Sequence, residues 1–217
     1  MQDYKSPLEM FYHWEKEMPN KLYMRQPING EWLYWTWSET ATQVRKMATY
    51  LKSLDFPDNS KIATLSKNCA HWIISDLAIM MAGHVSVPLY PNLKSESIAQ
   101  ILEHSEAKLL FVGKLDDFES MRPGIPEDLA CIAFPFYSED GYPVWDDLIK
   151  DIDPMTENVV RLPNELATII YTSGTTGMPK GVMHKFYNFS FATSNAVPLL
   201  GLETEERFFS YLPLCLS

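Results

Sequence analysis

The chain has 217 residues, of which 46% are hydrophobic and 21% are charged, and its formal net charge at pH 7 is −10. This composition is typical of a globular protein that can bury a core, and it argues against a disordered chain. The acidic balance argues against a nucleic-acid partner, because nucleic-acid binding requires a basic face. It leaves room for a small phosphate ligand, because one loop can be electropositive within an acidic protein.

The cysteines and the N-terminus indicate the cellular compartment. Cys69, Cys131 and Cys215 are scattered and odd in number. They are typical of reduced thiols rather than of a disulfide framework, and no Cys/His pair has the spacing of a zinc site. Residues 1–19 are charged and lack the apolar stretch of a signal peptide or membrane span. We therefore expect a cytoplasmic protein without a transmembrane segment, and a peripheral contact with membranes stays open.

The first part of the chain predicts a short helix followed by a β-hairpin. Ser6 and Pro7 are typical of an N-cap and a first helical position. Asn29-Gly30 is a tight-turn signal between a strand at 21–26 and an aromatic strand at 31–37. We expect the tryptophans of the second strand to pack onto a neighbouring layer rather than to form a ligand platform.

Residues 38–112 predict alternating helices and strands. The expected elements are a helix capped by Ser38, a strand at 61–65, a helix at 72–81 after a cap at Asn68, a strand at 85–90, a helix capped by Ser95 and a strand at 108–112. Gly83 is expected to close the second helix. Pro88 indicates that the strand at 85–90 lies at a sheet edge or ends there. This alternation predicts a parallel sheet with helices on its faces.

Residues 114–150 predict a loop-rich region around a short strand at 129–134. Asp146 and Asp147 could be offered as an acid/base pair, but adjacent carboxylates on a short surface helix are usually solvated. Residues 151–165 are polar and are expected to form a connector.

The apolar, β-branched run at 167–171 predicts a buried strand that leads into YTSGTTGMPKG at 171–181. Glycines allow a sharp turn and a close approach to a ligand, and successive N–H groups can then form an anion-binding nest. Hydroxyl donors come from Thr172, Ser173, Thr175 and Thr176, and Lys180 adds a charge suited to phosphate. The loop is not a Walker A motif, because Pro179 replaces the second glycine. The alternative is a solvated loop between two strands.

The chain after the loop predicts a strand at 181–184, a helix at 185–197 and a strand at 207–214. His184 is a candidate base, but a packed or capping histidine is the favoured interpretation.

Two stretches carry a family resemblance. YTSGTTGMPKG resembles the phosphate-binding signature of the adenylate-forming superfamily, and MAGHVSVPLYPNLKSESIAQILEHSEAKLLFV resembles long- and medium-chain fatty acyl-CoA synthetases. The resemblance implies the first part of their large N-terminal domain: an α/β fold with a layered parallel or mixed sheet, flanking helices and an N-terminal β-hairpin. It implies an α/β subdomain at 1–165 and the start of the ATP-binding core at 166–217.

The resemblance also implies the chemistry. In the family, ATP and a carboxylate give an acyl-adenylate and pyrophosphate, and CoA then takes the acyl group, with Mg²⁺ as the metal. The implied phosphate-binding residues are Thr172, Ser173, Gly174, Thr175, Thr176, Gly177 and Lys180. Thr172 is the implied Mg²⁺ contact, and Lys180 is the one residue offered for a catalytic role.

The family is more than twice as long as this chain, and relatives commonly have a histidine where this chain has Leu216. Our first hypothesis is therefore the N-terminal portion of an ATP-dependent fatty acid–CoA ligase that is inactive alone because the downstream part is required. A C-terminal remainder and a homo-oligomer are its candidate partners. The second is a stand-alone phosphate-binding or scaffold module that complements a separately encoded partner. A coincidental loop in an unrelated parallel-sheet protein is the third.

Overall fold

The computed structural model of the chain describes residues 5–137, 141–172, 179–201 and 206–216. Its helices are α1 (Pro7–Glu17), α2 (Trp37–Ser53), α3 (Ala70–Met81), α4 (Ser95–Ser105), α5 (Phe118–Met121), α6 (Trp145–Ile149) and α7 (Phe186–Leu200). Its strands are β1 (Leu22–Ile28), β2 (Glu31–Thr36), β3 (Lys61–Leu65), β4 (Val85–Leu89), β5 (Leu109–Val112), β6 (Ala130–Ala133), β7 (Leu166–Thr172) and β8 (Lys180–Lys185). Short 3-10 turns lie at Arg122–Gly124 and Leu214–Leu216.

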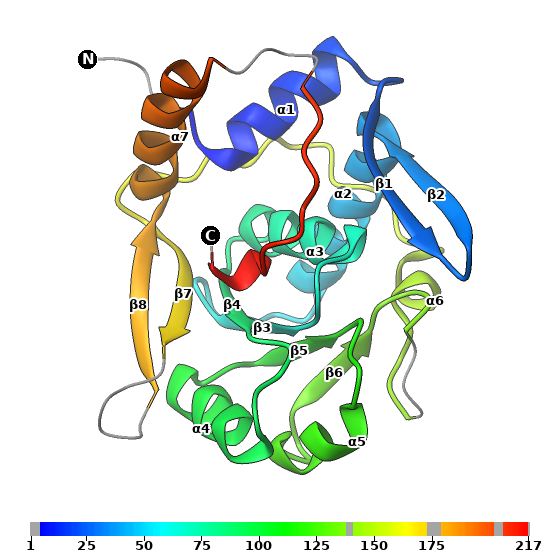
Figure 1. Ribbon diagram of the computed structural model, residues 1–217, viewed down its shortest axis with the longest axis vertical. Coiled ribbons are helices and arrows are strands. Elements are labelled where there is room, and N and C mark those ends of the chain that lie inside the picture. The colour runs from blue at the N-terminus through cyan, green and yellow to red at the C-terminus, as the bar shows by residue number, and fades with distance from the viewer. Residues whose placement is uncertain (1–4, 138–140, 173–178, 202–205, 217) are drawn as a thin grey trace.

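Within these described ranges, six strands form one mixed sheet in the order β6-β5-β3-β4-β7-β8, and β1 and β2 form a separate hairpin (Figure 1). Figure 1 shows α4 and α5 below the strands and α1, α2 and α3 above them. The expected α/β fold with flanking helices and an N-terminal hairpin is therefore confirmed. No helix within the described part of the chain is both long and apolar enough to cross a bilayer.

Local signals set the N-terminal elements. The Ser6 hydroxyl accepts a hydrogen bond from the Glu9 N–H, and the Glu9 carboxylate accepts one from the Ser6 N–H, which forms a capping box for α1. The turn between β1 and β2 places Asn29 and Gly30 at φ angles of 52° and 86°. Asparagine and glycine tolerate this left-handed region, so the predicted hairpin turn is confirmed.

Three helices begin with a different capping residue from the one expected. Thr36 rather than Ser38 caps α2, Cys69 rather than Asn68 precedes α3, and Lys94 rather than Ser95 precedes α4. Thr36 prevails because it forms a second capping box, with Glu39, directly at the end of β2.

The aromatic side chains of β2 and the start of α2 have different environments. Trp35 is buried, and Trp37 stacks on Tyr23 of β1 with ring centroids 3.8 Å apart. The packing prediction is confirmed for these two. It is wrong for Trp32, which is 49% exposed and lies under the guanidinium of Arg25 at 5.1 Å.

The sheet is parallel through β6, β5, β3, β4 and β7, and β8 joins it antiparallel to β7. β4 therefore lies between two strands, and the edge position that Pro88 suggested is wrong. The alternative, a strand end, fits: Pro88 is the last residue but one of β4, and β7 pairs with β4 only at Ser86. The proline therefore falls where no hydrogen bond to β7 is required.

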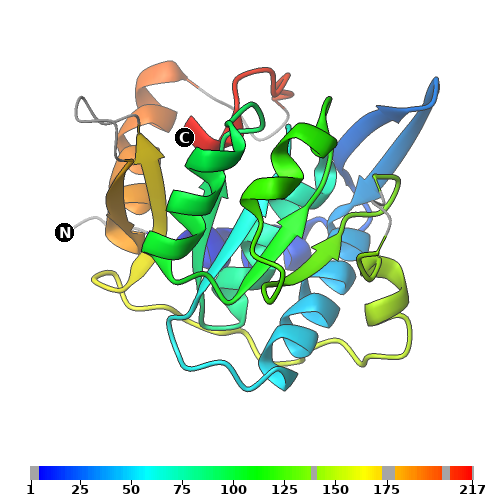
Figure 2. The same cartoon turned by 90° about the horizontal axis from the view of Figure 1, so that it is seen from below.

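Alternate residues of the strands supply two hydrophobic cores, one on each face of the sheet. Ile62 of β3 packs with α1, α2, α3 and α6, whereas its neighbour Ala63 packs with α4 and α5. Figure 2 shows the green helices α4 and α5 on the opposite side of the strands from α2. This two-sided burial explains why β4 and β5 are buried at every position and why β5 is apolar throughout.

The strand expected at 207–214 is wrong. Residues 206–213 have no regular secondary structure and pair with no described strand, and a 3-10 turn follows. Asn68 holds this segment instead: its amide donates to the Ser210 hydroxyl at 2.9 Å and to the Leu212 carbonyl at 2.7 Å, and its oxygen accepts from the Leu214 N–H at 3.0 Å. Hydrogen bonds from the Asn68 side chain thus hold this segment in place of pairing with a neighbouring strand.

Candidate functional site

The candidate site begins where β7 ends. The chain leaves β7 at Thr172, and Ser173, Gly174, Thr175, Thr176 and Gly177 lie outside the described residues. It returns at Pro179 and enters β8 at Lys180, which is in register with Thr172. Both side chains are exposed. The predicted strand before the loop is confirmed, and the structure brings together the two implied ligand-binding residues that it describes, Thr172 and Lys180.

The sheet topology places Thr172 and Lys180 at the carboxyl ends of the parallel strands, where ligands commonly bind. β3, β4, β5 and β7 run parallel, so their carboxyl ends lie together. The chain passes from β3 to β4 on one side and then returns to β5 on the other side of β3. Ligands of open α/β sheets bind outside the carboxyl ends of the strands near such a reversal.

Tyr171 and Gly181 form the next pair below Thr172 and Lys180. A Cβ on Gly181 would lie 2.8 Å from the Ile169 side chain and 3.2 Å from the Tyr171 ring, so only glycine fits without displacing them. Tyr171 is 5% exposed, and burial raises the pKa of its hydroxyl. The phenol is therefore neutral at physiological pH.

The Tyr171 hydroxyl lies 2.7 Å from Nδ1 of His104, in the last turn of α4. The rings meet edge to face, with centroids 5.7 Å apart and planes at 87°. Sequence reasoning assigned His104 no role. Its partner is 67 residues away, and no local pattern signals such a contact.

Two other features lie at the carboxyl edge of the sheet. Lys67, after β3, forms an ion pair with Asp116, after β5. A cavity of about 400 Å³ is lined by segments 91–96 and 116–121. Within the described residues, no three His, Cys, Asp or Glu side chains come together to hold a metal ion.

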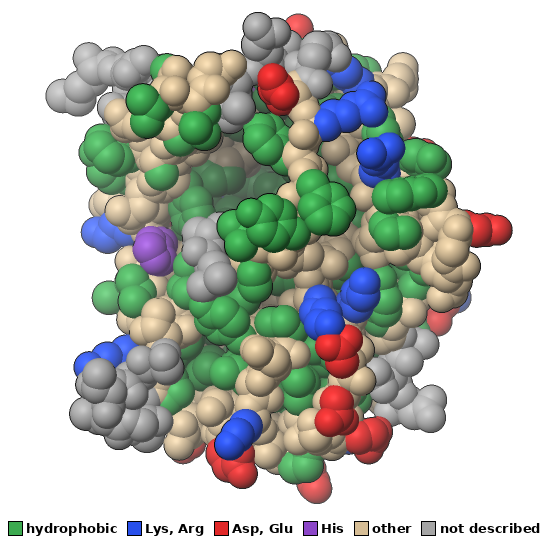
Figure 3. Space-filling view, viewed as in Figure 1, with side chains coloured by type: hydrophobic (Ala, Val, Ile, Leu, Met, Phe, Trp, Pro, Cys, Tyr) green, Lys and Arg blue, Asp and Glu red, His purple; other side chains and the backbone are tan. Residues whose placement is uncertain are grey.

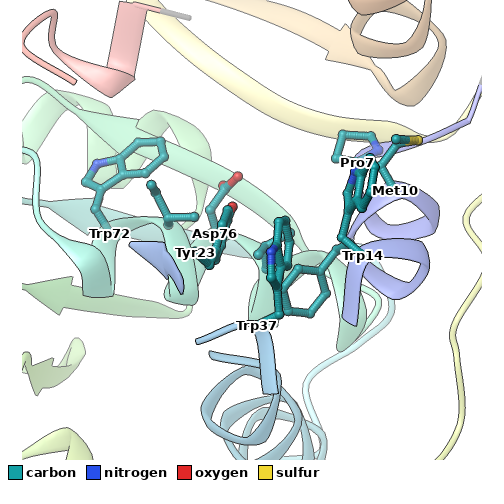
Figure 4. Close-up of a pocket in the computed structure, with 10 residues that line it drawn as sticks. Pro7, Met10, Trp14, Tyr23, Trp37, Trp72 and Asp76 are labelled. Atoms are coloured by element: carbon teal, nitrogen blue, oxygen red, sulfur yellow. The ribbon is translucent and has the colours of Figure 1, made fainter. Parts of the chain in front are cut away.

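A second cavity, of about 200 Å³, lies between α1, β1, α2 and α3. Figure 4 shows side chains from these elements converging on it, among them Trp14, Tyr23, Trp37 and Asp76. Burial raises the pKa of Asp76 to about 6, although a hydrogen bond with Ser86 opposes this shift. Half of the ten lining residues are aromatic, and none of them is an implied ATP-binding residue.

The other titratable residues considered from the sequence lie away from the loop or are packed. Asp146 and Asp147 lie in the first turn of α6, not on β7 or β8, and the pKa of Asp146 is raised by burial and by Asp147. His184 lies in β8, half-buried and 6.3 Å from the Phe189 ring, which fits the favoured interpretation of a packed histidine. Burial raises the pKa of the Cys131 and Cys215 thiols to about 11, so neither is a thiolate nucleophile at neutral pH.

Known proteins similar to this chain include acyl-CoA ligases. A family model described as "AMP-binding enzyme" matches residues 11–216. Long chain acyl-CoA synthetase 5 of Arabidopsis thaliana is 28% identical over 92% of this chain, and long-chain-fatty-acid–CoA ligase FadD15 of Mycobacterium bovis is 30% identical over 94%. The matches cover 34% and 36% of those proteins, so the chain spans about a third of the length of these curated relatives.

Solved structures show the same fold. Acetoacetyl-CoA synthetase from Streptomyces lividans matches with a TM-score of 0.82 and 21% identity over 97% of this chain and 35% of that one. O-succinylbenzoate coenzyme A synthetase from Bacillus subtilis, in complex with AMP, matches with a TM-score of 0.73 and 21% identity over 97% of this chain and 50% of that one. The chain therefore belongs to the AMP-binding enzyme family, and its curated relatives are acyl-CoA ligases.

Proposed function

We propose that this chain is the N-terminal part of an ATP-dependent fatty acid–CoA ligase. The reaction joins a fatty carboxylate to the α-phosphate of ATP, releases pyrophosphate, and then transfers the acyl group to the thiol of CoA with release of AMP. The substrate class comes from the names of the relatives, which are long-chain fatty acid–CoA ligases. The observation that carries the proposal is the Thr172–Lys180 pair at the carboxyl edge of the sheet.

The residues at this edge fit a polyphosphate with Mg²⁺. Lys180 is exposed at the first position of β8, where its ammonium group can neutralise phosphate charge. The Thr172 hydroxyl is exposed beside it and can contact Mg²⁺. Ser173, Gly174, Thr175, Thr176 and Gly177 complete the proposed ligand set. When bound, Mg²⁺ would offset phosphate charge, and the chain's own part is to bind and orient the triphosphate.

We further propose a boundary at residue 165, with a subdomain at 1–165 and the start of the ATP-binding core at 166–217. The connector supports this boundary, because it has no regular secondary structure between residue 152 and β7. Arg161 holds it in place: its guanidinium donates to the carbonyls of Met80 and His84 at 3.1 and 3.3 Å. The free, buried cysteines support a reducing, cytoplasmic location.

A surface on α7 and the segment 206–212 supports the idea that more polypeptide is needed. Its exposed hydrophobic side chains are Tyr187, Phe191, Val197, Leu199, Leu200, Phe208, Phe209, Tyr211 and Leu212. Figure 3 shows hydrophobic side chains gathered near the centre of one face, beside a hollow. Large exposed apolar surfaces usually mark an interaction site. We propose that downstream sequence of the ligase covers this surface, either on the same chain or as a separately encoded partner.

The first test is binding. Isothermal titration of the chain with MgATP and with inorganic pyrophosphate should show that K180A weakens both by about tenfold or more, the loss of a charge-assisted contact. Lys185, at the other end of β8, provides the matched control K185A. Equal affinities for K180A and the unaltered chain would contradict the phosphate site.

The second test is activity. The chain alone should give no ATP–pyrophosphate exchange with a panel of fatty acids, and adding the C-terminal two thirds of a related ligase should restore exchange. Robust exchange by the chain alone would overturn the claim that more polypeptide is required. A tight one-to-one complex with a separately encoded polypeptide would favour the stand-alone module.

A further inference from the structure

The contact between α4 and β7 connects a helix to the strand that leads into the phosphate loop. His104 Nδ1 and the Tyr171 hydroxyl are 2.7 Å apart. Either atom can donate, depending on the histidine tautomer. Neither residue belongs to the ligand set proposed above.

The helix that carries His104 is packed against the sheet. Ile98, Ile101 and Leu102 of α4 are at most 3% exposed and pack in the core on that face of the sheet. The helix ends at Glu106 in the left-handed conformation, directly after the turn that carries His104. The backbone of His104 thus belongs to a well-packed helix, and its exposed side chain reaches from that helix to the strand.

The strand end of the contact lies next to the proposed ligand residues. The Tyr171 ring lies against Gly181, and a Cβ there would come within 3.2 Å of it. Thr172 and Lys180 follow immediately in the β7–β8 register. β8 is largely exposed and is an edge strand in the described sheet, so its first residues are held mainly by their pairing with the end of β7.

We propose that His104 is a positioning residue for the phosphate site. By holding the Tyr171 hydroxyl, it fixes the end of β7 and the Tyr171–Gly181 pair. It thereby sets where Lys180 presents its ammonium group. His104 contacts no substrate, and its effect passes through Tyr171. This inference rests on the proposed phosphate site, but the contact can be tested without it.

The binding test is a double-mutant cycle between His104 and Tyr171, measured with inorganic pyrophosphate by titration calorimetry. H104A and Y171F should each weaken binding about fivefold, the usual size of one lost hydrogen bond. H104A in the Y171F background should cause no further loss, because the partner is already gone. Equal losses in the two backgrounds would overturn the proposal.

Two further variants separate positioning from a general structural effect. H104N should restore the affinity for pyrophosphate, because the asparagine amide also carries a polar atom bonded to Cγ, where histidine has Nδ1. H13A removes a histidine from α1 and should leave affinity unchanged. If H104N binds as weakly as H104A, the hydrogen bond is not the cause and the proposal fails.

Amide hydrogen exchange provides a readout that needs no ligand. H104A and Y171F should speed exchange at residues 180–182, H104N should not, and the β1–β2 hairpin should be unaffected. If the unaltered chain fails to bind pyrophosphate but the variants still change amide exchange in this way, the phosphate site is wrong and the positioning contact stands. Unchanged exchange at 180–182 in H104A would overturn the positioning role itself.

Discussion

The burial of His71 predicts how the stability of the fold depends on pH. His71 lies on α3, is 3% exposed, and its Nε2 is 2.9 Å from the Gln43 side-chain oxygen. That oxygen is an acceptor, so Nε2 carries the proton of the neutral imidazole and Nδ1 is unprotonated. Aromatic rings surround the imidazole, with Trp145 at 5.5 Å and Phe134 at 5.9 Å between centroids. Burial lowers the pKa of His71 from 6.5 to about 4.

The size of the effect follows from this shift. Between pH 6.5 and 4 the unfolded chain binds a proton at His71, and the folded chain does not. The free energy of unfolding therefore falls as the pH drops through this window. The difference between the ordinary pKa of 6.5 and the folded pKa of about 4 corresponds to roughly 3 kcal/mol of unfolding free energy.

Asp76, five residues later, acts in the opposite direction. Its folded pKa of about 6 lies above the ordinary 3.8, so its stabilising contribution is present at low pH and is lost as the pH rises through 6. The total pH dependence of the chain is therefore the sum of opposed effects. The contribution of His71 must be measured as a difference between variants.

The assay is urea unfolding of the unaltered chain and of H71F at pH values from 4 to 7.5, followed by tryptophan fluorescence. Between pH 7 and pH 4, the free energy of unfolding of H71F should rise by about 3 kcal/mol relative to that of the unaltered chain, because phenylalanine cannot take up a proton in the unfolded state. The same comparison in a D76N background should give the same gain, because Asp76 is then absent from both chains. A difference between H71F and the unaltered chain that does not vary with pH would refute the reasoning.

Three other outcomes follow from single contacts. G181A should lower the free energy of unfolding by about 1–3 kcal/mol, since the new methyl group overlaps the Ile169 side chain; an unchanged urea midpoint would contradict this packing. N68A should release the segment 206–213 and speed tryptic cleavage after Arg207, whereas cleavage at the original rate would show that Asn68 is not its clamp. R161M should cost about 3 kcal/mol or more in thermal or urea unfolding, because buried carbonyls lose a charged donor, and a loss below 0.5 kcal/mol would argue against this role.

Much of the fold could be predicted because the signals are local. Ser6 and Pro7 start a helix, Asn29-Gly30 makes a turn, and short apolar runs form buried strands. Each depends on residues within a few positions of one another, so the sequence predicts the element without knowledge of its neighbours. The apolar, β-branched run at 167–171 predicted the strand before the loop in the same way.

Other features were decided by contacts distant in sequence. Pro88 suggested an edge, yet β4 lies inside the sheet because β3 and β7 flank it. The proline is tolerated there because β7 pairs with β4 only at Ser86. The segment 206–213 has the composition of a strand, but in the structure Asn68 holds it instead.

For the candidate site, the sequence alone determined the kind of residues present: glycines, hydroxyls and one lysine in a fixed order. Only the tertiary structure decided that Thr172 faces Lys180 across two paired strands, and that His104 reaches Tyr171 from a helix. The physical reason is that chain propensities act over a few residues, whereas strand order and side-chain partners depend on which distant surfaces pack together.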